Sequence, residues 1–212
     1  MTEQTMFRIA FVILLAGILA MRGYFMWKVR RAGERLMPDR EAVEREGGSA
    51  VLALRIVVFL IFMAFLVMYI VGMAWIDFFS FPLPAWLRWT GFALGLLSLA
   101  FWTWTQVALD TRWSAQLQLR AEHQLVTGGP YARIRHPLYA AMFAWAIALA
   151  LLTANWLFVA LAVLSIAGTL VRVPKEERMM LEAFGDEYQA YMQRTGRFLP
   201  KLRGMDDEPG TG

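Results

Sequence analysis

The chain has no cysteine and only two histidines, His123 and His136, among its 212 residues. The absence of cysteine excludes disulfides, a thiolate nucleophile and a cysteine-ligated metal. Two histidines are too few for a histidine-built metal site, so no metal is expected. The sequence also shows no strand pattern of useful length and no Gly-x-Gly-x-x-Gly motif, which excludes a nucleotide held by a Rossmann sheet.

Apolar residues, by contrast, are in excess. They make up 58% of the chain, whereas soluble domains contain about 45–50%. Long apolar runs predict five membrane helices at residues 6–27, 51–76, 85–108, 138–153 and 155–173, since about 20 residues cross the hydrocarbon core. The first run is long and lacks a basic leading region, so no cleavable signal is expected. The predicted fold class is therefore all-α, a polytopic membrane protein.

The chain is expected to form a single membrane domain. Residues 1–110 contain three N-terminal spans, residues 111–200 a core with a helical hairpin, and residues 201–212 a disordered tail. Pro137 suits the first turn of a helix, and the hairpin is predicted to turn at residues 153–155. Gly91 and Gly95, four residues apart, indicate close helix packing.

Residues 174–199 follow the last predicted span and read as an amphipathic helix. Apolar and aromatic side chains recur there at steps of three and four residues, which is the helical period: Met180, Leu181, Phe184, Tyr188 and Tyr191. Pro174 lies near the predicted start. We expect this helix to complete a site on one face of the membrane.

Lysine and arginine concentrate in three segments. Residues 22–45, 109–137 and 172–203 hold 18 of the 21 basic residues. With five spans, all three segments lie on one side of the membrane, and the positive-inside rule makes that side the cytosol. The N-terminus is then outside. These loop residues account for the net charge of +4, and no nucleic-acid partner is expected.

A dense polar island lies between the apolar runs, at residues 129–139, with the sequence Gly-Pro-Tyr-Ala-Arg-Ile-Arg-His-Pro-Leu-Tyr. Arginine, histidine and tyrosine are costly beside a bilayer unless they serve a function. A loop that merely sets the topology explains the arginines. It does not explain a histidine next to a proline with tyrosines on both sides, which favours a functional site.

A second polar block begins directly after the last predicted span. It contains Glu176, Glu177, Phe184, Gly185, Tyr188, Tyr191, Arg194, Arg197 and Pro200. Acids near a helix N-terminus gain about 0.3–1 kcal/mol from the helix dipole, which is an ordinary explanation for the glutamates alone. A helical hairpin, however, places both blocks at the same membrane face. Together they predict one membrane-bound site made of two halves.

The combined pattern resembles the isoprenylcysteine carboxyl methyltransferase family. It consists of Gly-Pro-Tyr-x-x-x-Arg-His-Pro-x-Tyr, a helical hairpin, Glu-Glu, Phe-Gly-x-x-Tyr-x-x-Tyr and Arg-Thr-Gly-Arg-Phe-Leu-Pro. Related integral-membrane enzymes include the phospholipid N-methyltransferases. The resemblance covers residues 117–200, and residues 1–110 add only a compatible number of spans.

This resemblance implies a methyltransferase that uses S-adenosylmethionine, held at the cytosolic face by the last two membrane helices and the C-terminal segment. The cofactor-binding residues that it implies are Tyr131, Arg135, His136, Pro137, Tyr139, Glu176, Glu177 and Tyr188. The catalytic residues that it implies are Arg135, Glu177, Arg194 and Arg197. Arg194 or Arg197 is the candidate for placing an acceptor carboxylate. The expected partners are the lipid bilayer and a lipophilic or lipid-modified substrate.

The acceptor itself stays open at this point. A carboxylate needs no base, whereas an amine or a thiol must lose a proton, which would give a glutamate or a tyrosine a larger role. Isoprenylcysteine, phospholipid amines, small thiols and other lipophilic acids all fit the sequence. A sterol-reductase-like enzyme that uses a nicotinamide cofactor is an alternative, but the acidic pair followed by Phe184-Gly185 favours the methyltransferase. A non-catalytic membrane scaffold is a third possible function, and the complete motif argues against it.

Two tryptophans, Trp102 and Trp104, lie near the inner end of the predicted helix 85–108. Tryptophans at this depth are typical of the interfacial aromatic belt. The alternative is that they line a membrane door through which a lipophilic acceptor enters.

Overall fold

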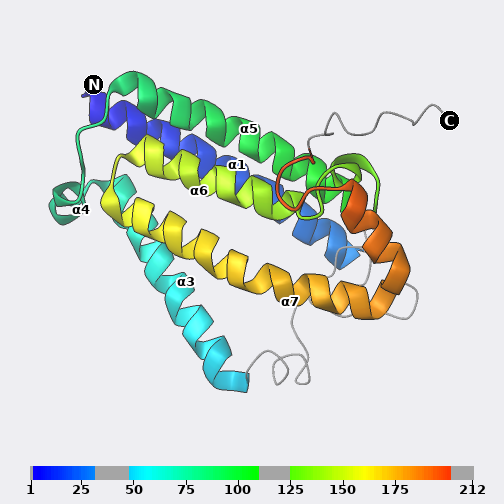
Figure 1. Cartoon of the computed structure of the whole chain (residues 1–212). Helices are drawn as coiled ribbons and strands as arrows, with labels where there is room; N and C mark the ends of the chain where they lie inside the picture. Colours follow the sequence, from blue (N-terminus) through cyan, green and yellow to red (C-terminus); the bar gives the residue numbers. More distant parts are fainter. Residues whose placement is uncertain (1, 32–47, 110–124, 202–212) are drawn as a thin grey trace, which may run out of the picture.

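The computed structural model describes residues 2–31, 48–109 and 125–201. Its elements in chain order are α1 (Glu3–Arg31), α3 (Gly48–Val71), α4 (Ala74–Phe78), α5 (Ala85–Leu109), the 3-10 turn η2 (Gly129–Ala132), α6 (Pro137–Thr153) and α7 (Trp156–Arg194). Figure 1 labels the α-helices. The described parts contain two isolated β-bridges but no β-strand of several residues. The all-helical prediction is confirmed. The predicted tail lies, beyond residue 201, outside the described residues.

Three of these helices, α1, α5 and α7, are long and apolar enough to cross a membrane. The described apolar stretch Leu60–Val71 and helix α6 are shorter. The membrane character follows from these helices, while the count of five spans stays a prediction. The predicted helix 51–76 is wrong at its end, because Gly72 takes the left-handed φ of +78° and stops α3, and residues 74–78 form the separate helix α4.

The predicted boundary between a last span and a separate amphipathic helix is also wrong. Helix α7 runs from Trp156 past Pro174 with helical backbone angles, although an interior proline removes one backbone hydrogen bond and usually kinks or ends a helix. The direction changes instead at Gly185, with φ of +50° and ψ of −124°. This turn folds the end of α7 back toward the start of α6 (Figure 1).

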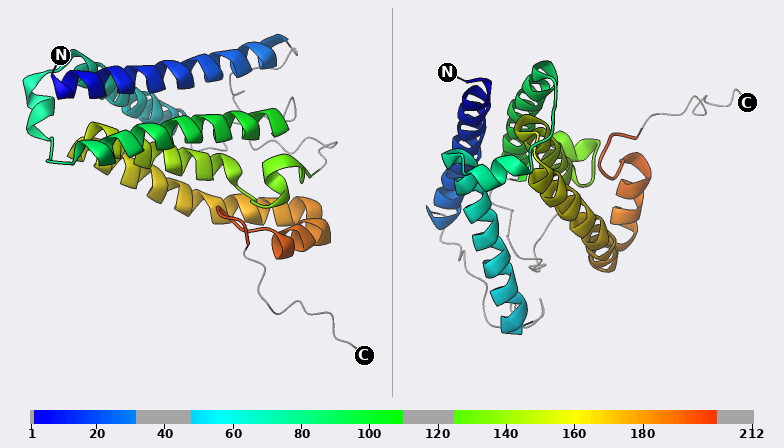
Figure 2. Two further views of the ribbon diagram at one scale, coloured as in Figure 1. Left: turned by 90° about the horizontal axis from the view of Figure 1, so that it is seen from above. Right: turned by 90° about the vertical axis from the view of Figure 1, so that its left-hand side faces the viewer.

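Helices α5 and α6 lie between α1 and α7 (Figure 2). The close approach predicted from the α5 glycines is confirmed. A Cβ atom on Gly91 would lie 2.8 Å from the backbone nitrogen of Leu152 in α6, and one on Gly95 would clash with the Leu14 side chain of α1. Ser98 donates a hydrogen bond to the Ala141 carbonyl oxygen of α6 at 2.7 Å. The seam between α5 and α6 is therefore tightly closed.

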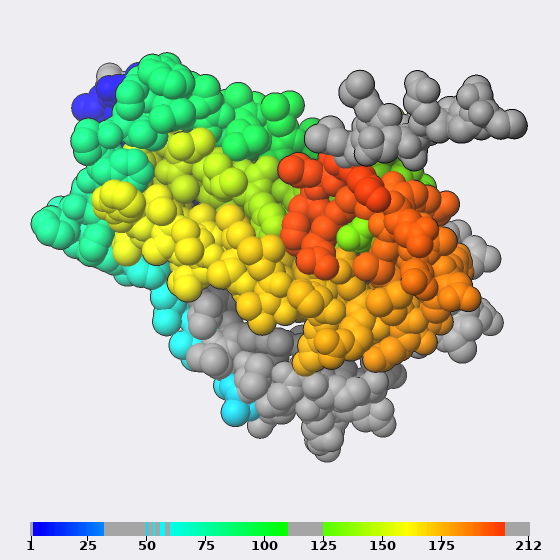
Figure 3. All heavy atoms as spheres, viewed as in Figure 1, coloured from blue at the N-terminus to red at the C-terminus, as the bar shows by residue number. Residues whose placement is uncertain are grey.

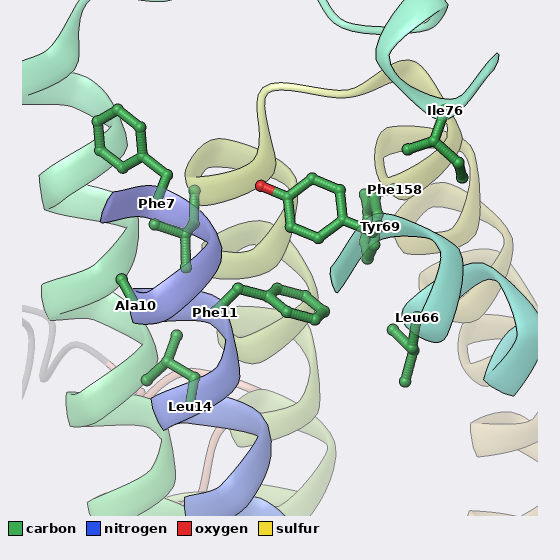
Figure 4. Close-up of a cluster of buried hydrophobic side chains, with 9 residues drawn as sticks. Phe7, Ala10, Phe11, Leu14, Leu66, Tyr69, Ile76 and Phe158 are labelled. Carbon is green, nitrogen blue, oxygen red and sulfur yellow. The ribbon is translucent and has the colours of Figure 1, made fainter. Parts of the chain in front are cut away.

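The main apolar core lies at the end of the bundle where the chain begins. It gathers side chains from α1, α3, α4, α6 and α7 (Figure 4): Phe7, Ala10, Phe11, Leu14, Leu66, Tyr69, Ile76, Leu152 and Phe158. Phe11, Tyr69 and Phe158 meet edge to face, with ring centroids 4.9–5.5 Å apart. Helix α3 joins the bundle at this end and diverges from it toward the other (Figure 1).

The predicted tight hairpin between α6 and α7 is confirmed. Ala154 takes the left-handed φ of +48°, and the Asn155 side chain caps α7 by accepting a hydrogen bond from the Leu157 backbone N–H. Pro137 occupies the first turn of α6, as predicted. The hairpin brings the start of α6 and the polar half of α7 together at the far end of the bundle.

Candidate functional site

Glu177 is the centre of the polar cluster at this end. Its carboxylate, 5% exposed, accepts hydrogen bonds from Arg135 Nε at 3.1 Å and from Arg197 Nε at 3.2 Å and Nη2. His136 Nε2 lies 3.3 Å from the same Oε1. The acid comes from α7, whereas two of its partners immediately precede α6 and the third follows α7. One buried carboxylate thus ties three segments together.

The segment after α7, residues 195–201, is here called the C-terminal strap. It pairs with residues 133–136 as a parallel bridge: Gly196 N–H donates to the Arg133 carbonyl oxygen, Arg135 N–H to Gly196 and His136 N–H to Arg197. The Arg135 side chain also donates to the backbone oxygens of Met192 and Thr195. The strap is therefore attached by both backbone and side-chain bonds.

Glu176 belongs to a second, adjacent group. Its Oε1 accepts hydrogen bonds from the Tyr139 hydroxyl at 2.7 Å and from Arg172 Nε. Both bonds found in the described part of the chain fall on this one oxygen, so Oε2 remains able to accept from a ligand. The Glu176 side chain is 13% exposed, and that of Arg172 is 48% exposed.

Four of the six tyrosines in the chain lie in this region. Tyr139 and Tyr188 interact with the two acids, and Tyr131 and Tyr191 lie behind them. The Tyr191 hydroxyl donates to the Tyr131 carbonyl oxygen at 2.7 Å, which fixes η2 against the end of α7. Tyr188 packs on Tyr191 with ring centroids 5.8 Å apart. Green atoms of the η2 region remain visible between the red strap and the orange end of α7 (Figure 3).

The charges of the cluster do not cancel. Burial lowers the pKa of His136 below its ordinary value, although Glu177 and Glu176 act in the opposite sense. Burial of the Glu177 carboxylate tends to raise its pKa, but the hydrogen bonds from Arg197 and Arg135 outweigh this and leave it lowered. At neutral pH the cluster therefore holds two guanidinium groups, one carboxylate and a neutral imidazole. The surplus of one positive charge suits an anionic ligand group.

The structure brings most of the predicted residues together. Arg135, His136, Glu177 and Arg197 meet around one carboxylate, Tyr139 contacts Glu176, and Tyr188 lies beside this group. Pro137 begins α6 and Tyr131 lies in η2. Arg194 lies apart: its exposed guanidinium sits 5.7 Å from the Tyr191 ring centroid. Their roles in binding and catalysis remain predictions.

Sequence reasoning missed two members of the site. Arg172, one helical turn before Glu176, was counted only among the basic residues of segment 172–203, and its i, i+4 spacing to Glu176 was the signal that could have revealed it. Phe198 belongs to the Arg-Thr-Gly-Arg-Phe-Leu-Pro motif but was not singled out as a site residue. It contacts the His136 ring at 6.0 Å and the Phe143 ring at 5.1 Å between centroids, which requires the folded strap.

The two tryptophans of α5 have different environments. Trp102 is 7% exposed and packs with Ile18, Met21 and Ala141 between α1, α5 and α6, so it is neither a belt residue nor a wall open to the membrane. Trp104 is 54% exposed, as a belt residue would be. A Cβ atom on Gly129 of η2 would lie 3.1 Å from the Ala108 Cβ atom. Trp102 therefore does not line a membrane door, whereas a door lined by Trp104 stays a prediction.

Comparison with known proteins supports the resemblance. The model of the isoprenylcysteine carboxyl methyltransferase (ICMT) family matches residues 91–182, from α5 into the polar half of α7. The chain is 36% identical over 90 residues to protein-S-isoprenylcysteine O-methyltransferase of Tribolium castaneum, covering 42% of this chain and 32% of that protein. The protein of the same name from Schizosaccharomyces pombe is 34% identical over 82 residues, covering 38% and 35%.

A relative with a different name is the nickel-cobalt-cadmium resistance protein NccN of Alcaligenes xylosoxydans xylosoxydans, 30% identical over 114 residues, covering 53% of this chain and 54% of that one. A solved structure of the eukaryotic intramembrane Ras methyltransferase ICMT matches with a TM-score of 0.50 and 29% identity, covering 56% of this chain and 44% of that chain. The chain spans about a third of the curated isoprenylcysteine methyltransferases that it matches. The similarity to this family, predicted from the motifs, is confirmed.

Proposed function

We propose that this protein is an S-adenosylmethionine-dependent membrane methyltransferase that esterifies the carboxylate of a lipophilic acceptor of the isoprenylcysteine type. The observation that carries the proposal is the Glu177 cluster, in which a buried acid joins the Arg135-His136 motif to the C-terminal strap. All but the strap lie within residues matched by the family model. The relatives' names supply the class of acceptor.

The residues present fit the proposed cofactor. S-adenosylmethionine supplies a methyl group on a sulfonium, which a nucleophile takes by in-line displacement. The surplus positive charge of Arg135 and Arg197 suits its carboxylate. The available Oε2 of Glu176 can accept from its ammonium or ribose hydroxyls. The surrounding tyrosine rings offer π faces to a cation.

The protonation states of the site favour a carboxylate acceptor over an amine or a thiol. Glu177 is held ionised by three donors and has a lowered pKa, so it is a poor proton acceptor. Burial raises the pKa of Tyr188 to about 12, which keeps this phenol neutral. A carboxylate nucleophile needs no base. Arg172, half exposed and in contact with Glu176, joins Arg194 and Arg197 as a candidate to orient it.

The proposal includes five spans with the site facing the cytosol. The apolar part of α7 ends near Val173, and the Glu177 cluster follows within one helical turn. Such a position at the hydrocarbon boundary lets a water-soluble cofactor and a lipophilic acceptor meet. The basic residues of segments 22–45, 109–137 and 172–203 support this orientation.

The proposal is tested with purified protein, tritiated S-adenosylmethionine and two acceptors offered separately, N-acetyl-S-farnesyl-cysteine and a total phospholipid extract. We expect label in the farnesyl compound as a base-labile methyl ester. Label in the phospholipid alone would show that the acceptor is an amine and not a carboxylate. No label in either, together with no calorimetric binding of the cofactor, would refute the proposal.

Glu176→Gln tests the site itself by calorimetry with S-adenosylmethionine. We expect its affinity to fall by about tenfold or more, because hydrogen bonds to a charged acceptor contribute about 1.5–3 kcal/mol. Glu182→Gln, an exposed acid farther along α7, is the matched control and should bind as the wild type does. Equal affinities for all three proteins would remove Glu176 from the cofactor site.

A further inference from the structure

A continuous line of rings leads out of the polar site toward the membrane. His136 stacks on Tyr139, with centroids 5.7 Å apart and planes at 24°. Phe198 of the strap contacts His136, and Phe143 of α6 contacts Phe198 at 5.1 Å. The line begins at the Tyr139–Glu176 hydrogen bond and ends on an apolar part of α6. It therefore connects charged chemistry to a surface that suits hydrocarbon.

The same face of α6 continues this line into the bilayer. Tyr139, Phe143 and Ile147 follow one another at four-residue steps and so share one face of the helix. Ile147 is 45% exposed. Figure 3 shows the yellow-green surface of α6 uncovered directly beside the red strap. Hydrocarbon in the membrane can therefore reach Phe198 along α6 without separating packed helices.

A second conceivable route for hydrocarbon, between α5 and α6, is closed by tight packing. The α5–α6 seam has backbone-to-backbone approach at Gly91, and Trp102 is buried within it. Along α6 the covering is looser. Phe198 of the strap contacts the rings of His136 and Phe143, and the neighbouring Leu199 is 77% exposed. Ring contacts of this kind contribute about 0.5–1.5 kcal/mol each, so displacing the Phe198 ring costs less than separating α5 from α6, even while the hydrogen bonds of the strap backbone stay in place.

We infer that Phe143 and Phe198 hold the apolar tail of the acceptor, which lies along α6 past Ile147 with its carboxylate end at the Arg172–Glu176 group. The inference rests on the proposed function and adds where the tail binds. The pair then determines acceptor specificity: it selects for a long apolar tail, while the polar residues select for the reacting end. Cofactor affinity does not depend on it.

Steady-state kinetics test this with S-alkyl N-acetylcysteines of increasing chain length. For Phe143→Ala and Phe198→Ala we expect KM for N-acetyl-S-farnesyl-cysteine to rise about tenfold, the equivalent of about 1.4 kcal/mol, with calorimetric cofactor affinity unchanged. The rise should shrink for short chains. Phe78→Ala, an aromatic substitution at the opposite end where Phe78 is 83% exposed, is the control and should change nothing. An unchanged farnesyl KM in both variants overturns the inference, even if the enzyme methylates as proposed.

A second measurement does not require activity. Because the chain has no cysteine, Ile147→Cys carries a single thiol, and its labelling by a membrane-permeant maleimide can be followed with and without N-acetyl-S-farnesyl-cysteine. We expect protection of at least about threefold, whereas Leu97→Cys on α5, where Leu97 is 69% exposed, is not protected. Protection at both positions, or at neither, contradicts binding along α6. Absence of methyl transfer with protection intact would count against the proposed function alone.

Discussion

Two adjacent glutamates of the same helix have different surroundings. Successive residues of an α-helix point about 100° apart, so Glu177 faces the Arg135-His136 segment while Glu176 faces Tyr139. Glu177 has all its partners within the protein, which makes it a residue that positions others. Glu176 has an oxygen left to accept from a ligand. The sequence presented both as an acidic pair and could not assign these separate tasks.

Replacing Glu177 should release the strap. In Glu177→Gln two guanidinium groups lose the carboxylate that they share. Breaking a fully buried ion pair costs about 3–5 kcal/mol. Because Arg197 is partly exposed, we expect the free energy of unfolding to fall by less, about 2–3 kcal/mol. Limited trypsin digestion should cut after Arg197 or Lys201 faster than in the wild type. The exposed-acid variant Glu182→Gln should keep the wild-type cleavage rate. A strap that stays resistant in Glu177→Gln would show that the backbone bridge alone holds it.

His136 should make stability depend on pH. Its pKa is lowered in the folded protein by burial, whereas in the unfolded chain it is about 6.5. Between these two values the unfolded state binds more protons, so the free energy of unfolding falls as pH falls from about 6.5 toward the folded pKa. Thermal unfolding in detergent from pH 7.5 to 5.5 should therefore show a larger loss of Tm for the wild type than for His136→Gln. Identical slopes would mean that His136 is not buried as a neutral ring.

At the scale of elements, the sequence predicted the parts better than their joints. The α6–α7 hairpin was predictable because Thr153-Ala154-Asn155 interrupts an apolar run and asparagine caps helices well. The continuity of α7 through Pro174 could not be predicted, since a proline after an apolar run favours a helix boundary. The strap pairing was unpredictable for another reason. It depends on backbone bonds between residues 133–136 and 196–197, which leave no side-chain pattern.

Gly185 is the joint on which the site depends most. Its φ of +50° with ψ of −124° is strained for any residue with a Cβ, at a cost of about 1–3 kcal/mol. Gly185→Ala should lower Tm and weaken S-adenosylmethionine binding together, because Tyr188 and Tyr191 follow the turn. Gly168→Ala is the control: its Cβ would meet nothing within 4 Å, and alanine favours a helix by up to about 1 kcal/mol. Equal behaviour of the two variants would show that the turn tolerates a side chain.

Across the whole molecule, the charged side chains at the two ends of the bundle have different surroundings. At the end opposite the site, Arg8 pairs with Asp77 at 2.7 Å. Arg88 donates to the Leu152 carbonyl oxygen at 3.0 Å and lies over the Phe7 ring. Both arginines bind groups of other helices or turns and so link the segments at this end, although Arg8 Nε itself is buried without a hydrogen-bond partner in the described structure. Large aromatic side chains are exposed around the same end: Trp75, Phe78, Trp86 and Trp156. Such a belt is typical of a membrane interface.

This contrast leads to a prediction about orientation. If the aromatic end marks the outer interface, Ser80 lies outside the membrane and Ala132, beside the Glu177 cluster, lies in the cytosol; both are exposed. Single thiols introduced into the cysteine-free chain as Ser80→Cys and Ala132→Cys can be labelled in intact cells with an impermeant maleimide. We expect Ser80→Cys to react at once and Ala132→Cys to react only after the cells are opened, because positive residues near the site are retained inside. The reverse pattern would place the site outside, away from cytosolic S-adenosylmethionine, and would contradict the topology. Labelling of both from outside would instead require an even number of membrane crossings between the two positions, whereas one predicted span, 85–108, lies between them.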